Sequence, residues 1–152
     1  MKRRQLFEVM DQAWCPGWVR EGELDALRTL ARVFPVHRRV APLIAGVMRA
    51  HGQRSVVDLC SGGIGPLSWL WADIEHCLGR TVTVVCTDRY PQPRALDALD
   101  RGARARVSYH PDPVDAARVP AALVGVRTVF EGFHHLARPV AQALVAAAGS
   151  AG

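Results

Sequence analysis

Residues 54–65 read Arg-Ser-Val-Val-Asp-Leu-Cys-Ser-Gly-Gly-Ile-Gly, and this stretch decides the fold. Its first part, Arg54 to Cys60, is a short apolar run rich in valine, which predicts a buried β-strand. The glycines that follow it predict a tight turn. Gly65 and Pro66 then open a helix, since proline suits the first helical turn, and Gly79 ends it. A strand, a glycine-rich turn and a helix in this order indicate an α/β protein.

The same unit recurs further along the chain. Apolar runs predict three more strands, at Thr81–Thr87, Ala105–Tyr109 and Val124–Phe130. Helices are predicted between and after them, from Pro93 to Arg101 with Gly102 closing it, and from Pro139 to about Ala148. Strands that alternate with helices imply right-handed crossovers and a mainly parallel sheet covered on both faces.

Residues 1–52 have a helical period instead. Apolar side chains recur there at spacings of three and four, in two groups: Leu24, Leu27, Leu30, Ala31, Phe34, and Val40, Ile44, Val47, Met48, His51. Pro35 and Pro42 divide this region into short helices, and Gly52 is the expected stop. We therefore expect an N-terminal helical cap over residues 1–52 and a sheet domain over 53–152, folding as one unit.

Composition narrows the class of protein. A chain of 152 residues with 49% hydrophobic and 22% charged residues is typical of one globular domain. The net charge of +5 comes from arginines spread along the chain, with Lys2 the only lysine, so a nucleic-acid partner is not expected. The four cysteines have neither zinc-site nor disulfide spacing, and no apolar run reaches the roughly 20 residues of a membrane helix. We expect a reduced, cytoplasmic protein without a signal peptide or anchor.

Acidic residues mark the ends of the first three predicted strands. Asp58 lies inside the first, Asp88 follows the second, and Asp115 comes shortly after the third. In an open parallel sheet, ligands bind beyond the carboxyl ends of the strands. A carboxylate at Asp88 is suited to accept both hydroxyls of a ribose, and one at Asp115 the exocyclic amine of an adenine. The glycine turn and the helix that follows add N–H groups that a ligand can approach closely.

Together, the turn, Asp88 and Asp115 resemble the class I S-adenosylmethionine-dependent methyltransferases, over about Arg54 to Leu144. The resemblance implies a Rossmann-like three-layer sandwich whose sheet has the order 3-2-1-4 and stops after the fourth of the family's seven strands. It implies S-adenosylmethionine as cofactor and S-adenosylhomocysteine as product. The turn would contact the methionine part, Asp88 the ribose and Asp115 the adenine. The cofactor-binding residues carried over are Asp58, Cys60, Ser61, Gly62, Gly63, Gly65, Asp88, Arg89, Asp115 and Ala116.

The turn departs from the family pattern at two positions. The family has glycine where this chain has Cys60 and Ile64, so that Gly62 alone of three regular glycines is in register. Gly63 and Gly65 are expected to allow the same turn one residue displaced.

The end of the fourth strand supplies the candidate catalytic residues, Glu131, His134 and His135. Family members often place substrate-binding or catalytic groups there, and a histidine can take a proton from a hydroxyl acceptor because its ordinary pKa lies near neutrality. The implied function is methyl transfer to a small-molecule acceptor. Structural roles are the alternatives: a hydrogen-bonded histidine loop, and helix or turn caps at Asp88 and Asp115.

Two other readings stay open. The outer edge of the fourth strand, Val124 to Phe130, lacks a neighbour, and an apolar edge of this kind invites pairing with a second copy or a partner chain. The chain would then be a subunit of an enzyme, or a non-catalytic cofactor-binding or scaffold subunit. A nicotinamide-dependent enzyme is disfavoured because no GxGxxG pattern occurs between Cys60 and Leu70.

Overall fold

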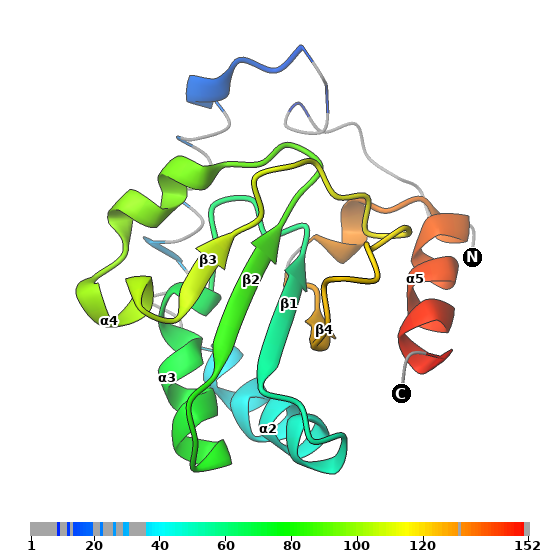
Figure 1. Cartoon of the computed structure of the whole chain (residues 1–152). Helices are drawn as coiled ribbons and strands as arrows, with labels where there is room; N and C mark the ends of the chain where they lie inside the picture. Colours follow the sequence, from blue (N-terminus) through cyan, green and yellow to red (C-terminus); the bar gives the residue numbers. More distant parts are fainter. Residues whose placement is uncertain are drawn as a thin grey trace.

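The computed structural model describes residues 36–130 and 132–150, and before them residues 9, 12, 14–19, 22, 26, 29 and 30. Its centre is a four-stranded, all-parallel sheet with the predicted order β3-β2-β1-β4. The strands are β1 (Ser55–Leu59), β2 (Thr83–Thr87), β3 (Val107–Tyr109) and β4 (Val126–Thr128), each inside the range predicted for it. Helices flank this sheet, so the α/β Rossmann-like sandwich is confirmed (Figure 1).

Four residues, one on each strand, form a row across the sheet near the carboxyl ends of the strands. Asp58 on β1 is in register with Cys86 on β2 and with Thr128 on β4, and Cys86 is in register with Tyr109 on β3. Because side chains alternate along a strand, these four point to the same face as Val56 and its neighbours two residues earlier. We call Tyr109, Cys86, Asp58 and Thr128 the Asp58 row.

The first face of the sheet carries the main core. It is covered by the 3-10 helix η2 (Val36–Val40), α2 (Ala41–Ala50), α3 (Leu67–Leu78), the 3-10 helix η3 (Pro93–Ala98) and α4 (Arg101–Arg104). Met48 of α2 and Leu70 of α3 are both fully buried, in one cluster with Val56 and Val84. The predicted helix end at Gly79 is confirmed, since this residue has the left-handed φ of 74°. Residues 36–50 therefore pack into the same core as the sheet.

The predicted inner face of α2 is partly wrong. The structure buries Ala41, Ile44, Ala45 and Met48, whereas Val47 is 47% exposed and His51 lies at the exposed helix end. Spacings of three, four and seven from Ala41 define one stripe of a helix, and Val47 lies off that stripe. The helix predicted from Leu24 to Phe34 falls mostly outside the described residues.

The helix predicted from Pro93 to Arg101 is also wrong in its course. Instead η3 ends at Ala98, and a separate α4 begins after Asp100. Asp100 has an extended backbone and its carboxylate accepts a hydrogen bond from the Ala103 N–H at 2.8 Å, which is the geometry of an N-cap. Gly102 therefore lies inside α4 and does not close the preceding helix.

The second face of the sheet is covered by less structure. The connection from β3 to β4 contains no helix, and α5 (Arg138–Ser150) lies on the β4 side of the sheet (Figure 1). The core there is small: Val57, Leu59, Ala116 and Leu144. Where the cover is thin, the strands carry polar side chains, and the Ser55 and Thr83 hydroxyls lie 2.9 Å apart.

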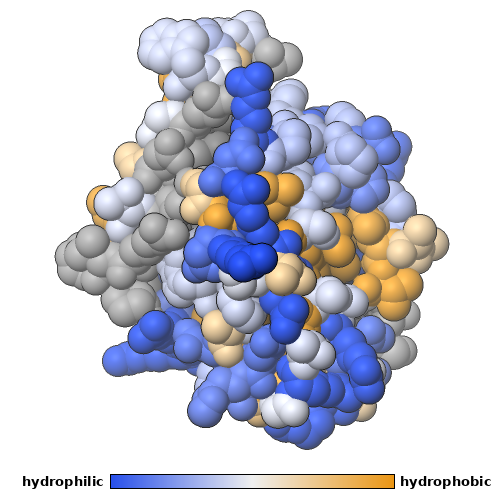
Figure 2. Space-filling model, turned by 60° about the vertical axis from the view of Figure 1, so that its left-hand side comes forward, coloured by the Kyte–Doolittle hydropathy of each residue, from blue (hydrophilic) through white to orange (hydrophobic). Residues whose placement is uncertain are grey.

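Residues 14–19 lie at the end of the molecule toward which the strands point (Figure 1). Cys15 is buried there, while Trp14 and Trp18 are 64% and 76% exposed. Figure 2 shows that hydrophilic residues cover most of the side nearest α4, with apolar residues gathered near its middle. Within the described part of the chain, no helix is both long enough and apolar enough to cross a membrane.

Candidate functional site

The turn after β1 has left-handed residues at positions 60, 62, 64 and 65. Cys60, Gly62 and Ile64 have φ angles of 58°, 47° and 74°, and Gly65 follows at 50°. The predicted displacement by one residue is therefore wrong, since Cys60 and Ile64 themselves have the left-handed φ and Gly63 does not. Each non-glycine residue of this kind costs about 1–2 kcal/mol. The backbone of the turn keeps a glycine-type shape despite the two side chains.

The Ile64 side chain does not obstruct the outer side of the turn. It is 1% exposed and packs in the first-face core. Burying an isoleucine contributes about 1.5–3 kcal/mol, which is enough to offset its left-handed φ. A Cβ atom added at Gly65 would meet nothing within 4 Å. The space beside Gly65 is therefore open.

Gly62 links the ends of three strands. Its N–H donates to Asp88 Oδ2 at 2.8 Å, and its carbonyl accepts from the Tyr109 hydroxyl at 2.9 Å. The Tyr90 N–H donates to the other carboxylate oxygen of Asp88, also at 2.8 Å. The plane of the Asp88 carboxylate is thus fixed by one backbone N–H at each oxygen. The Tyr90 contact is a local turn of the aspartate side chain, and the helix N-cap that was the structural alternative for Asp88 is not formed, since η3 has Gln92 at its N-cap without a side-chain hydrogen bond.

Asp58 lies beneath the turn, in the Asp58 row. It is 1% exposed, and its two carboxylate oxygens accept from the hydroxyls of Thr128 and Ser61, each at 2.7 Å. Burial raises the pKa of Asp58 to about 7; the hydrogen bonds from Thr128 and Ser61 oppose this rise, and the charge of Asp88 adds to it. Ser61 Oγ also accepts from the Thr87 N–H at 3.1 Å. Asp58 therefore holds the first residues of the turn to β2 and β4.

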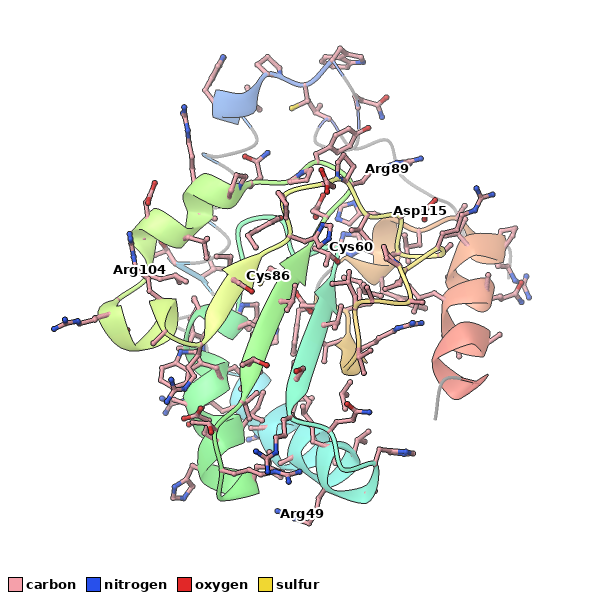
Figure 3. All side chains as sticks on the ribbon, in the orientation of Figure 1. Arg49, Cys60, Cys86, Arg89, Arg104 and Asp115 are labelled. Atoms are coloured by element: carbon pink, nitrogen blue, oxygen red, sulfur yellow. The ribbon has the colours of Figure 1, made fainter. Side chains whose placement is uncertain are left out.

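The segment after β3 is tied to Asp88 as well. The Val114 N–H donates to the Asp88 carbonyl at 2.9 Å, which brings Asp115 to the same end of the sheet. Asp115 is exposed, and its Oδ1 accepts from the Ala117 N–H at 2.9 Å, so it caps a turn. Ala116 is buried in the second-face core. Figure 3 shows Cys60, Arg89 and Asp115 toward the carboxyl ends of the strands, and Arg49 at the opposite end.

The loops after β1 and β4 touch each other. Gly132 is buried, and a Cβ atom added there would lie 2.6 Å from the Cys60 Cβ, closer than two such atoms can approach. The ring of Phe130, just before this point, contacts His37 of η2 edge-on, with ring centroids 5.7 Å apart. The fourth strand end thus lies between the β1 turn and the N-terminal helices.

The two candidate histidines follow Gly132 on a short 3-10 helix, η4 (Phe133–His135). Their ring centroids are 4.0 Å apart at an interplanar angle of 35°. His134 is exposed and His135 is half-buried. Glu131, the third candidate, lies outside the described residues. The Gly132 contact places this helix on the same side of the molecule as the β1 turn.

Sequence reasoning did not identify Tyr109 and Thr128, although both support the turn. Their contacts depend on strand register, which the sequence does not display. Each member of the Asp58 row is the last residue of its strand to face the first core, and each carries a hydroxyl, thiol or carboxyl where an aliphatic side chain would be usual. That shared position is the one signal the sequence contains.

Comparison of this chain with protein-family models, with curated proteins and with solved structures finds no match.

Proposed function

We propose that this chain binds S-adenosylmethionine at the carboxyl ends of its strands and transfers the methyl group to a small-molecule acceptor in the cytoplasm. The observation that carries the proposal is the hydrogen bond between the Gly62 N–H and the Asp88 carboxylate at 2.8 Å. It joins a turn with left-handed residues at positions 60, 62, 64 and 65 to the acidic residue expected to hold a ribose. The other residues of the proposed site would bind the parts of the cofactor on either side of this hydrogen bond.

The cofactor's methionine part would lie along the Cys60–Gly65 turn, whose outer side is open at Gly65. Asp88, with its carboxylate plane fixed by two backbone N–H groups, would accept the ribose hydroxyls. Asp115 and Ala116, anchored through Val114, would border the adenine. Arg89 is exposed at the same end, at the border of the site. Asp58 would support the turn from beneath.

The charges of the site fit the chemistry of this cofactor. S-adenosylmethionine supplies a methyl group on a positively charged sulfur, and Asp88 and Asp115 place negative charge at the end of the sheet where it would bind. The exposed imidazole of His134 is suited to take the proton of an acceptor hydroxyl, with His135 stacked against it. Glu131 is a further candidate for this role.

Calorimetric titration with S-adenosylmethionine and S-adenosylhomocysteine tests the proposal. We expect Asp88→Asn to weaken binding roughly tenfold or more, because it removes the charge from hydrogen bonds to the ribose. Asp97→Asn is the matched control, since it removes the same charge from an exposed residue that pairs only at 3.4 Å with Arg104. A folded wild-type chain that binds neither compound would contradict the proposal.

A second candidate is an interaction subunit, and the geometry of β4 favours it. Among the described residues, β4 pairs only with β1, and Val124 beside it is 63% exposed. Val126 and Val129 pack against the two core clusters, so charges there would damage the fold. Val124→Glu is the cleaner probe. A complex that this change splits would support a partner at β4; a wild type that sediments only as a monomer would exclude a second copy there.

A further inference from the structure

We infer that Tyr109 is a positioning residue of this site: its hydroxyl fixes the Gly62 carbonyl and thereby the shape of the turn that receives the ligand. The inference rests on the proposed function and assigns a role to a residue outside the cofactor-binding set predicted from the sequence. The hydroxyl-to-carbonyl distance is 2.9 Å. Tyr109 acts from β3, whereas the turn belongs to β1.

The Tyr109 ring is buried, so that its hydroxyl has a fixed position. It is 9% exposed and belongs to the first-face core cluster, on a strand that packs against η3 and α4. Burial raises the pKa of its phenol, opposed by hydrogen bonding from the backbone of Gln92, so the hydroxyl stays protonated and can donate. The donor is therefore rigid and present over the whole physiological pH range.

The acceptor, in contrast, is the carbonyl of a glycine, the residue with the greatest backbone freedom. Gly62 is followed by Gly63, and two consecutive glycines lose more conformational entropy on folding than any other pair. The Gly62 N–H is held by Asp88, but the carbonyl belongs to the next peptide group, which can rotate separately. The Tyr109 hydroxyl holds that second peptide. Both peptide groups of Gly62 are thus fixed, one from β2 and one from β3.

The position of Asp88 depends on the same contact. Its Oδ2 accepts from Gly62, so a turn that shifts at Gly62 also releases one of the two N–H groups that orient the carboxylate. Tyr109 therefore acts on the methionine side of the site directly and on the ribose side through Asp88. We expect the larger effect on ligands that contact the turn.

The test compares Tyr109→Phe with Ser108→Ala. Both changes remove one hydroxyl from β3 that donates to a backbone carbonyl; that of Ser108 donates to Val84 at 3.2 Å on the opposite face of the sheet. The probes are S-adenosylmethionine and 5′-methylthioadenosine, which lacks the amino-acid part. We expect Tyr109→Phe to weaken S-adenosylmethionine binding roughly three- to tenfold, and 5′-methylthioadenosine binding less. Ser108→Ala should change neither.

Amide hydrogen exchange on the ligand-free protein provides a second readout. Tyr109→Phe should speed exchange at the Gly62 and Ile64 amides, and leave the Val82 amide, bonded to Glu75 at the far end of β2, unchanged. Unchanged affinity for S-adenosylmethionine, or an equal loss for both probes, would overturn the inference. If the wild type bound neither probe, the proposed function would fail, and unchanged exchange at Gly62 would then overturn the role of Tyr109 independently.

Discussion

The ends of the first three strands and the end of the fourth are held very differently. Around Gly62, backbone and side-chain hydrogen bonds connect the β1 turn to Asp88, Tyr109 and the buried Asp58. After β4, the described residues approach the turn closely at Gly132, and the chain then runs into a short 3-10 helix with an exposed His134. One part of the site is built into the core, and the other lies on its surface.

This difference separates two tasks of the proposed enzyme. A cofactor common to many reactions is best bound by groups that are already in place, because ordering them on binding costs free energy. An acceptor is recognised by residues that vary, and loops on a rigid scaffold carry such residues. The first three strand ends have the character expected of the cofactor side, and the fourth that of the acceptor side.

The largest effect on stability is expected at Asp58, in the part of the site that is built into the core (the rigid half). Its pKa rises from 3.8 unfolded to about 7 folded. Between pH 3.8 and about 7, the folded chain therefore holds a proton on Asp58 that the unfolded chain has released. The stability that this difference contributes is fully present below pH 3.8 and is lost as the pH rises through about 7. We expect the free energy of unfolding to fall by about 4 kcal/mol over this window from Asp58 alone.

Urea denaturation across this pH range measures the effect. Asp58→Asn cannot titrate, so this variant should lack that part of the pH dependence and should be more stable than wild type at mildly alkaline pH. Asp97→Asn, at an exposed position, should keep the wild-type slope. Identical slopes for the wild type and Asp58→Asn would show that Asp58 is not held as described.

The next largest effect is expected in the part of the site after β4 that lies on the surface (the surface half). His134→Ala should lower the rate of S-adenosylhomocysteine formation roughly a hundredfold, the usual contribution of a general base, while cofactor affinity stays nearly unchanged. His76→Ala, at an exposed position on α3, is the control. Unchanged turnover in His134→Ala would remove this histidine from the mechanism, and a parallel loss of cofactor affinity would break the proposed separation of the two halves.

The point where the halves meet gives a third prediction. Gly132→Ala should destabilise the fold by about 2 kcal/mol, because the added methyl group would overlap the Cys60 Cβ at 2.6 Å. Adding Cys60→Gly removes that atom, and the nearest remaining neighbour is the Cys60 carbonyl oxygen at 3.4 Å. The double variant should recover most of the loss in thermal unfolding. Additive effects of the two changes would contradict this close contact.

Cys60→Gly alone is expected to have the smallest effect. Cys60 is only partly buried, so burial offsets its left-handed φ of 58° less than it does for Ile64. Glycine should relieve about 1 kcal/mol of this strain, less the entropy that glycine adds to the unfolded chain. Ile64→Gly should instead destabilise, because it removes a side chain that is 1% exposed. Chemical denaturation of both variants side by side distinguishes the two positions.

The sequence predicts the four strands well, because short apolar runs that alternate with helical segments have few other interpretations. It fails where a side chain redirects the backbone, as when the Asp100 cap starts α4 and leaves Gly102 inside a helix. In the turn, counting glycines pointed to a displaced register, whereas Cys60 and Ile64 themselves have the left-handed φ and Ile64 packs in the core. The hydrogen-bond partners of Tyr109 and Thr128 cannot be predicted from the sequence, since they are set by the pairing of distant strands; the sequence displays only the position of these polar residues near the ends of their strands.

The most direct test of the proposed site is a titration of the isotope-labelled chain with S-adenosylmethionine, followed by amide chemical shifts. We predict that the largest changes in chemical shift fall on residues 60–65, 88–90 and 114–116, while the amide shifts of α2, at the opposite end of the sheet, stay unchanged. Saturable changes confined to those three segments would establish the site. Changes centred elsewhere, or none in a folded protein, would contradict it.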